Sequence, residues 1–432
     1  MTKFPTQRSD PAVATCSISR RRLLQGALAG AGAIALSGPI STRVAMAADP
    51  GYTGDVLVVI SLRGGFDGLS AIVPAGDPDY LLARPNIGVP SSALLGLDAM
   101  FGLHPALAPL LPFWKSGTFG AVHAVGQPDP TRSHFEAMDE MDRAAPNSSL
   151  RTGWLDRAIG QRSLTTVFQA LQLGDSLPSK ALAGPSPELT LGSIHDFGIA
   201  GTTSDDNPAW AKAERDRWVG ALNSMYGDAP DPLKVPLTAA MGAVKTTGDL
   251  NSATYTPLVE YPDNDLAKAL SDVARLIKAQ VGVQIVCIDF DSWDMHSGLG
   301  RFDQADSWMT SQLRALSGSL AAFAGDLGPR LASTSVVTLS EFGRRVAENA
   351  SGGVDHGHGN AVLLLGGKID GGKVHGKWPG LAEANLDDGD LAGVTDYRVV
   401  LAEILRKRCG QTGLGTVFPG ADLVNELGVA KV

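Results

Sequence analysis

The feature that most constrains this fold is a set of short apolar runs in which the hydrophobic residues are continuous rather than alternating. These runs are residues 55–61, 119–125, 283–289, 335–339 and 361–365. Continuous runs are typical of strands that are covered on both faces. Amphipathic helical stripes lie between them, such as Leu266, Leu270, Val273 and Ile277, with another over 313–323. This alternation predicts an α/β fold, a three-layer αβα sandwich with a mostly parallel central sheet.

The predicted strands and helices favour one large domain over 48–432. The segment 175–262 differs in composition, being rich in Ser, Asn, Asp, Pro and Thr, and is expected to form an insertion or cap. Thr395 is expected to cap a last helix that Gly410 ends. The chain has 432 residues, of which 44% are hydrophobic, so it can bury a large core, and three cysteines are too few for a disulfide scaffold.

Two of the cysteines lie outside the N-terminal leader, and the sequence allows two interpretations of them, a free thiol or a disulfide. Cys287 lies in an apolar run, which fits a buried free thiol. A disulfide with Cys409 is the other interpretation, because the chain is expected to work in an oxidising compartment.

Residues 1–47 have the composition of an export signal. Arg20, Arg21 and Arg22 precede two leucines and the apolar stretch 26–38, and small residues follow at 45–47. This order is typical of a secretory signal, and the paired arginines resemble a twin-arginine export signal. The apolar stretch is too short to span a bilayer comfortably. We therefore expect a periplasmic or secreted protein without a stable membrane span, whose partner during export is the twin-arginine translocation machinery.

The charge of the remaining chain argues against nucleic acid as a partner. The whole chain has a formal charge of −9, and removal of the leader leaves 30 basic and 44 acidic residues, or about −14. Such an acidic surface repels a phosphate backbone.

Metal-ligating side chains occur beside one end of the predicted strands. They are Asp67 after the first run, Asp294 and His296 after the third, Glu341 after the fourth, and Asp355, His356 and His358 before the fifth. Four of the eight histidines lie in such segments, the fourth being His134 after the second run. Ligands of open α/β sheets bind at the carboxyl ends of the strands, and Asp and His are poor core residues unless they are paired or bind metal. The pattern predicts a site for divalent metal ions.

Individual residues of this set also have structural interpretations. Asp67, between glycines, is equally typical of a turn. Ser133 and Glu136 form the pattern of a capping box, although a hydroxyl at a helix N-terminus also suits a nucleophile. The pair His356 and His358, spaced by one glycine, is the most specific element, because two imidazoles in a short loop can chelate a metal.

Five ordered motifs together resemble one family. They are the segments 63–69, 132–137, 293–296, 340–344 and 355–359. The set is similar to the bacterial domain-of-unknown-function 1501 family (DUF1501), over roughly residues 50 to 410. The resemblance implies the alkaline phosphatase-like fold, which sulfatases share, with a nucleophile and one or two divalent ions (Zn, Mn, Ca or Mg).

The resemblance also implies roles for single residues. By position, Asp67 and Glu341 are metal carboxylates, Asp294 and His296 belong to one metal site, and His358 or His356 is the last imidazole. Ser133 occupies the nucleophile position. The superfamily has Asp-His where this chain has Glu341-Phe342, so one metal site is altered, or Asp355 and His356 refill it.

The implied activity is metal-dependent hydrolysis of phosphate or sulfate esters by nucleophilic displacement, with an anionic ester as substrate. Arg63, Arg132 or Arg344 is expected to hold the non-bridging oxygens of the ester. The altered motif at Glu341 leaves a second hypothesis open, an exported metal-containing binding or assembly protein of the cell envelope without rapid catalysis.

Overall fold

A computed structural model describes residues 55–96, 98–161, 166–174, 177–199, 202, 207–227 and 234–432. The predicted export signal at 1–47 lies outside the described residues. Nine strands form the central sheet, in the order β10-β4-β9-β8-β1-β7-β5-β6 with β11 beside β4. They are β1 (Val56–Leu62), β4 (Phe119–Gly126), β5 (Ala170–Leu173), β6 (Leu189–Leu191), β7 (Ile285–Phe290), β8 (Thr334–Leu339), β9 (Asn360–Gly366), β10 (Val374–His375) and β11 (Thr395–Asp396). Two further strands, β2 (Ile72–Val73) and β3 (Gly102–Leu103), pair separately.

Strand direction decides which segments meet at the edge of the sheet. β1 runs parallel to β7 and β8, and Val59 lies opposite both Cys287 and Val337. β9 is antiparallel to both of its neighbours, β4 and β8. The start of β9 therefore lies at the same edge as the ends of β4 and β8. This reversal brings the segment before β9 next to those that follow β4 and β8.

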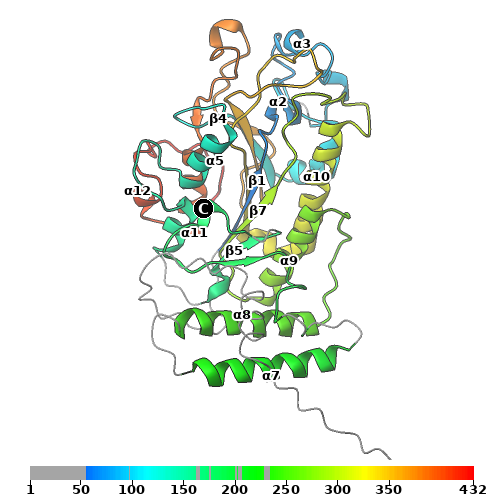
Figure 1. Cartoon of the computed structure of the whole chain (residues 1–432). Coiled ribbons are helices and arrows are strands. Elements are labelled where there is room, and N and C mark those ends of the chain that lie inside the picture. Colours follow the sequence, from blue (N-terminus) through cyan, green and yellow to red (C-terminus); the bar gives the residue numbers. More distant parts are fainter. Residues whose placement is uncertain are drawn as a thin grey trace, which may run out of the picture.

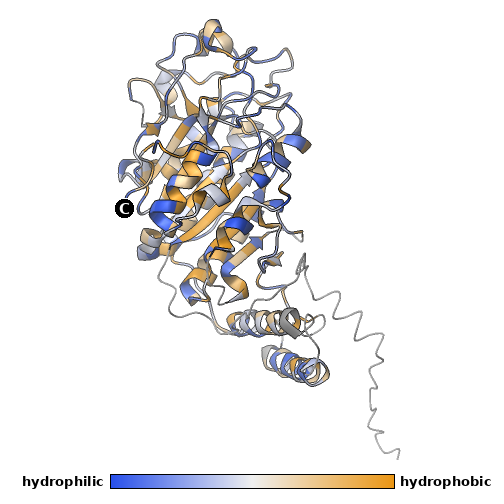
Figure 2. Cartoon of the chain, turned by 90° about the vertical axis from the view of Figure 1, so that its left-hand side faces the viewer, coloured by the Kyte–Doolittle hydropathy of each residue, from blue (hydrophilic) through white to orange (hydrophobic). Residues whose placement is uncertain are grey.

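Helices cover both faces of the sheet (Figure 1). One layer consists of α9 (Asp265–Ala279) and α10 (Trp308–Leu327). The opposite layer contains α5 (His134–Arg143), α6 (Trp154–Ile159), α11 (Tyr397–Cys409) and α12 (Leu414–Val417). Figure 2 shows the apolar strands between these layers. The predicted three-layer αβα arrangement with a mostly parallel sheet is thus confirmed.

The shorter helices α2 (Gly68–Ala71), α3 (Tyr80–Ala83) and α4 (Leu111–Lys115) lie in the connections between β1 and β4. The helices α7 (Pro208–Tyr226) and α8 (Lys234–Ser252) lie side by side beyond one end of the sheet (Figure 1). They fall in the segment predicted as an insertion, which also contributes β6 to the edge of the central sheet. Among the helices of the described residues, none has the length and apolarity that crossing a membrane requires.

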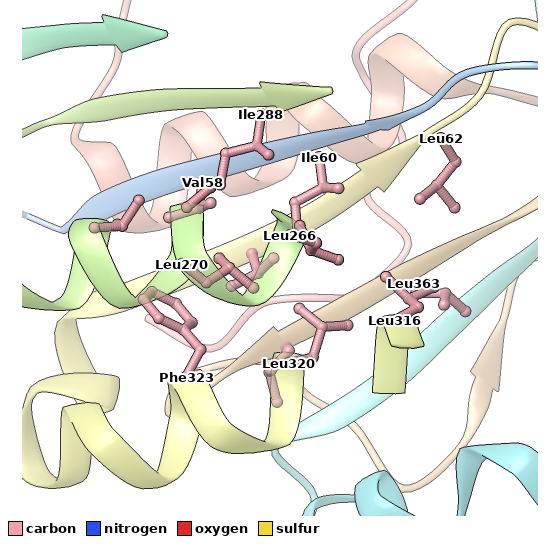
Figure 3. Packing of buried hydrophobic residues seen from close by; sticks show 14 of the residues in the cluster. Val58, Ile60, Leu62, Leu266, Leu270, Ile288, Leu316, Leu320, Phe323 and Leu363 are labelled. Carbon is pink, nitrogen blue, oxygen red and sulfur yellow. The ribbon is translucent and has the colours of Figure 1, made fainter. Parts of the chain in front are cut away.

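The core follows from the alternation of side chains along the buried strands. Val58, Ile60 and Leu62 of β1 face α9 and α10, as Figure 3 shows, while Leu57 and Val59 belong to the core on the opposite face. All five side chains are buried. Each such burial contributes roughly 1.5–3 kcal/mol to stability, which makes the sheet a rigid base for the loops at its edge.

The predicted last helix is present as α11, but its cap differs from the prediction. Thr395 belongs to β11, and Asp396 caps the helix by accepting a hydrogen bond from the Arg398 N–H at 2.9 Å. Gly410 ends the helix in the left-handed conformation, as predicted. Cys287 is buried and forms no disulfide within the described residues, so the buried-thiol interpretation of Cys287 agrees with the structure.

Candidate metal centre

The loops at the edge of the sheet are held together by one buried arginine. Arg344 follows β8, and its side chain is completely buried. Its guanidinium donates to the Gly65 carbonyl at 2.7 Å, the Val354 carbonyl at 3.1 Å and the Trp293 carbonyl at 3.1 Å. These carbonyls belong to the loops after β1, before β9 and after β7. Arg344 therefore fixes three loops, and its donors are engaged within the protein rather than facing a ligand.

Glycines allow two of these loops to approach each other closely. The Gly343 N–H donates to the His358 carbonyl at 2.9 Å, and the Gly357 N–H donates to the Gly343 carbonyl at 2.8 Å. A Cβ atom at Gly343 would lie 1.9 Å from the Gly359 carbonyl oxygen. The short ladder between these segments therefore depends on glycine, and it places His356 beside Arg344.

Three histidines converge on Asp294, one from the start of α5 and two from the loops after β7 and before β9. The ligand atoms of His134, Asp294 and His356 all lie within 4.8 Å of one another. The His296 Nε2 atom lies 2.8 Å from the His356 Nε2 atom and 3.2 Å from Asp294 Oδ1. The His134 Nε2 atom lies 3.7 Å from Asp294 Oδ2 and has no hydrogen-bond partner among the described residues.

The outer nitrogen of each imidazole is held by an oxygen. The Nδ1 atom of His134 lies 2.8 Å from Glu341 Oε1, that of His296 lies 2.9 Å from Asp355 Oδ1, and that of His356 lies 2.8 Å from the Arg132 carbonyl. Carboxylate and carbonyl oxygens only accept, so each Nδ1 carries the hydrogen. In the neutral form, each Nε2 then presents a lone pair toward the centre of the group.

This pattern is what metal-binding histidines show. A ligating imidazole usually donates its other N–H to a carboxylate or a carbonyl, which fixes its tautomer and orientation. Two bare Nε2 atoms 2.8 Å apart repel unless a cation or a proton lies between or beside them. The donors of His134, His356 and Asp294, with the His296 Nε2 atom beside them, therefore fit a divalent metal ion.

The charge of Asp294 is stabilised by its neighbours. Burial raises the pKa of Asp294, but the hydrogen bond and the positive charge of Arg344 outweigh burial and bring the pKa below its usual value. The Arg344 Nη2 atom lies 2.7 Å from Asp294 Oδ1. Burial also lowers the pKa of His356. Both effects favour the protonation states that a metal requires, an ionised carboxylate and a neutral imidazole.

Phe342 stands where the resemblance implied a histidine, and it lies against the imidazoles of the centre. Its ring is buried and packs 4.8 Å from the His134 ring and 4.6 Å from the His356 ring, measured between centroids. It therefore forms an apolar wall behind two of the imidazoles. Glu341, the residue before it, contacts the centre through the His134 Nδ1 atom.

Other predicted site residues have different partners. Asp67 is buried and paired with Arg84, at 2.6 Å between Oδ2 and Nη1. Arg63 pairs with Asp289 at 3.2 Å and with Asp142 at 3.4 Å. The structure thus places both predicted residues in ion pairs of the protein itself.

His358 also lies apart from the three converging imidazoles. Its Nε2 atom is 2.9 Å from the Gln127 carbonyl, and its Nδ1 atom is 3.7 Å from Asp387 Oδ2. Of the two histidines in the predicted chelating loop, His356 is the one that the structure brings to Asp294.

Ser133 precedes α5 at the N-cap position, but the predicted capping box is wrong. The Ser133 side chain makes no capping hydrogen bond within the described residues. The Thr131 Oγ1 atom instead accepts from the Ser133 N–H at 3.2 Å, a bond that a capping box would give to Glu136, and it donates to Glu136 at 2.9 Å. The Ser133 hydroxyl is therefore not used as a cap.

His134 is the member of the centre that was not predicted as a ligand. The sequence does contain a signal for this role. His134 follows a predicted strand, and His296, His356 and His358 also lie beside the ends of predicted strands. In that segment a role, nucleophile or helix cap, was predicted for the neighbouring Ser133 instead. The position of His134 as the first residue of α5 turns its imidazole toward Asp294.

Comparison with known families gives a match over part of the chain. The family model described as protein of unknown function (DUF1501) matches residues 200–396. This segment is similar to the DUF1501 family. The match confirms the predicted resemblance for the motifs at 293–296, 340–344 and 355–359. The DUF1501 match does not include the two earlier motifs, and so it does not include His134.

Solved structures with some likeness include a sulfatase and a transferase. The PsFucS1 sulfatase from Pseudoalteromonas sp. is 12% identical, with a TM-score of 0.34, over 88% of this chain and 74% of that one. A lipooligosaccharide phosphoethanolamine transferase from Neisseria meningitidis is 13% identical, with a TM-score of 0.28, over 76% of this chain and 51% of that one. Both TM-scores are below 0.5, so neither likeness carries an argument about activity. No curated protein sequence matches the chain.

Proposed function

We propose that this chain is an exported metal-dependent hydrolase of phosphate or sulfate esters. The observation that carries the proposal is the convergence of three Nε2 atoms on the Asp294 carboxylate, at 3.2 to 3.7 Å, with each imidazole held through its Nδ1 atom. His134, His296 and His356 would hold the ion together with Asp294. An imidazole-rich donor set favours zinc or a transition metal over calcium and magnesium, which prefer oxygen ligands.

A bound divalent ion would lower the pKa of an attacking hydroxyl and neutralise negative charge on the ester oxygens. The chain's own residues supply the rest of the site. His134 begins α5, so the first turn of this helix, whose N–H groups have no partner inside the helix, starts at a proposed ligand. A helix N-terminus favours an anionic group, here the phosphate or sulfate of the ester. The Ser133 hydroxyl, which makes no capping bond in the described part of the chain, lies at the same helix end and is the proposed nucleophile.

The proposal is tested by metal analysis paired with an ester panel. Wild-type protein is incubated with zinc or manganese and assayed on phosphate monoesters, phosphate diesters and sulfate esters, with and without a chelator. We expect chelator-sensitive turnover of at least one ester class, and loss of both metal and turnover in His134→Ala. The matched control is His195→Ala, which removes an exposed imidazole that pairs with Asp196. Turnover that persists after complete metal removal would contradict the proposal.

One observation favours the second candidate, a metal-containing binding or assembly protein. Four protein donors converge here, and a closed set of four protein ligands is typical of structural metal sites, whereas catalytic sites keep one position open. Stoichiometric metal together with no turnover across the whole panel would support this alternative.

The location of the protein is also part of the proposal. The leader at 1–47 supports export through the twin-arginine machinery to the periplasm or beyond. N-terminal sequencing of the exported protein tests it, with a start just after Ala47 as the expected result. Replacement of Arg20 and Arg21 by lysines should retain the protein inside the cell.

A further inference from the structure

Arg132 connects the proposed metal centre to a turn that lies outside it. Its backbone carbonyl accepts the hydrogen bond from the His356 Nδ1 atom at 2.8 Å. Its guanidinium contacts Asp390 Oδ2 through Nη2 at 2.7 Å and through Nε at 3.1 Å, and contacts Asp388 Oδ2 at 3.3 Å. One residue therefore fixes the imidazole through its backbone and is itself fixed through its side chain.

The turn at 387–391 is well suited to act as an anchor. The Asp390 side chain is only 4% exposed, although Asp388 beside it is 80% exposed. Asp387 and Asp390 close the turn with hydrogen bonds of 2.9 and 3.0 Å between their backbones. The turn is thus a compact unit with one buried carboxylate directed at Arg132.

The same turn binds two backbone segments near His356, the one that contains Val346 and the one that contains Gly359. The Val346 N–H donates to the Gly389 carbonyl at 3.2 Å, and the Gly359 N–H donates to the Leu391 carbonyl at 2.7 Å. Arg345 also reaches this turn, donating to the Asp388 carbonyl. The turn therefore contacts both the loop that carries His356 and, through Arg132, the loop that leads to His134.

We propose that Arg132 is a positioning residue of the metal centre, clamped by Asp390 so that its carbonyl holds the His356 imidazole with Nε2 directed at the metal position. This inference rests on the proposed metal site and adds a determinant that lies outside the donor set. It also differs from the role that the resemblance suggested, a guanidinium that holds ester oxygens. The Arg132 guanidinium donates to two carboxylates of the protein instead.

Arg132 should affect metal affinity through the orientation of the His356 imidazole. Residues that orient a metal ligand typically change metal affinity by 10–100-fold when they are replaced. Replacement of Arg132 by alanine keeps the carbonyl but releases it from the turn, so His356 should become less well oriented rather than lost. The main effect of Arg132→Ala should therefore be on metal affinity rather than on the binding of a substrate.

The test measures Zn²⁺ affinity by competition with a chelating dye, and the visible spectrum of Co²⁺-loaded protein. We expect Arg132→Ala and Asp390→Asn each to weaken Zn²⁺ binding by roughly 10–100-fold and to alter the Co²⁺ spectrum. The double variant should be about as weak as either single variant, because both remove the same contact. Arg132→Lys, which retains the charge, should restore part of the affinity.

The matched control is Arg301→Ala, which removes another partly exposed arginine, paired with Asp303 at 2.9 Å. It should leave affinity and spectrum unchanged. Wild-type affinity and an unaltered Co²⁺ spectrum in folded Arg132→Ala, or strictly additive effects in the double variant, would overturn the role of the clamp. A wild-type protein that binds no Zn²⁺ would instead overturn the metal centre itself, so the two failures are distinguishable.

Discussion

Arg84 donates to both carboxylate oxygens of Asp67, at 2.6 Å between Nη1 and Oδ2 and 3.0 Å between Nη2 and Oδ1. Both side chains are almost fully buried. The guanidinium also donates to the Val346 carbonyl at 2.9 Å and to the Arg345 carbonyl at 3.0 Å. The pair thus ties the loop after β1 to the segment that approaches the proposed metal centre.

The ion pair leads to the first prediction. Asp67→Ala leaves the buried Arg84 guanidinium without a counter-charge, and breaking a buried pair in this way costs about 3–5 kcal/mol. We expect the free energy of unfolding, measured in urea, to fall by that amount. The metal content of the protein that remains folded should be unchanged. Loss of metal without loss of stability would instead support the ligand role that the motif implied for Asp67.

The second prediction concerns Glu341, which contacts the proposed centre through His134. Its Oε1 atom accepts from the Gly64 N–H at 2.8 Å and from the His134 Nδ1 atom at 2.8 Å. Glu341→Gln keeps the size of the side chain but removes the charge that favours the His134 Nδ1–H tautomer. We expect roughly 10–100-fold weaker metal binding in a chelator competition assay. Glu383→Gln, at an exposed position, is the control and should bind metal like the wild type.

The sequence predicted the layers of the fold well, because continuous apolar runs and helical stripes report burial directly. The runs that became β1, β4, β7, β8 and β9 were predicted, and so were α9 and α10. The short strands β5 and β6 were not. They contain only four and three residues, and β5 carries a buried Gln172, so periodicity gives them little signal.

The site was predicted in outline but not in detail. Asp294, His296 and His356 follow or precede strands, and the sheet brings such positions together at one edge. The partners of the other candidates come from distant positions that no local pattern reveals. Arg84 lies 17 residues from Asp67 along the chain, and Asp390 lies 258 residues from Arg132.

The third prediction is a dependence of stability on pH that originates in Glu188. This side chain is buried, and its Oε2 atom has no hydrogen-bond partner in the described part of the chain. Burial, with a smaller contribution from the charge of Asp156, raises the pKa of Glu188 from 4.5 to about 8. Between pH 4.5 and about 8, the Glu188 carboxyl therefore carries a proton in the folded protein but not in the unfolded chain.

Stability should consequently fall as pH rises through this window. Between pH 7 and 8 we expect Glu188 to lower the free energy of unfolding by about 1 kcal/mol. Asp142, whose pKa burial raises to about 6, acts mainly below that range. Urea denaturation of the wild type and of Glu188→Gln at both pH values is the measurement. If the free energy of unfolding changed equally with pH in the two proteins, Glu188 would be ionised in the folded state.

The proposed function requires that the three imidazoles and the carboxylate of Asp294 bind one metal ion. X-ray absorption at the edge of the metal that co-purifies with the protein tests this most directly, because the spectrum reports the ligands of the ion. We predict one divalent ion per chain with three imidazole nitrogens among its ligands, and loss of that ion in Asp294→Ala. Protein that contains no metal after expression and zinc loading, or a metal spectrum without imidazole ligands, would contradict the account.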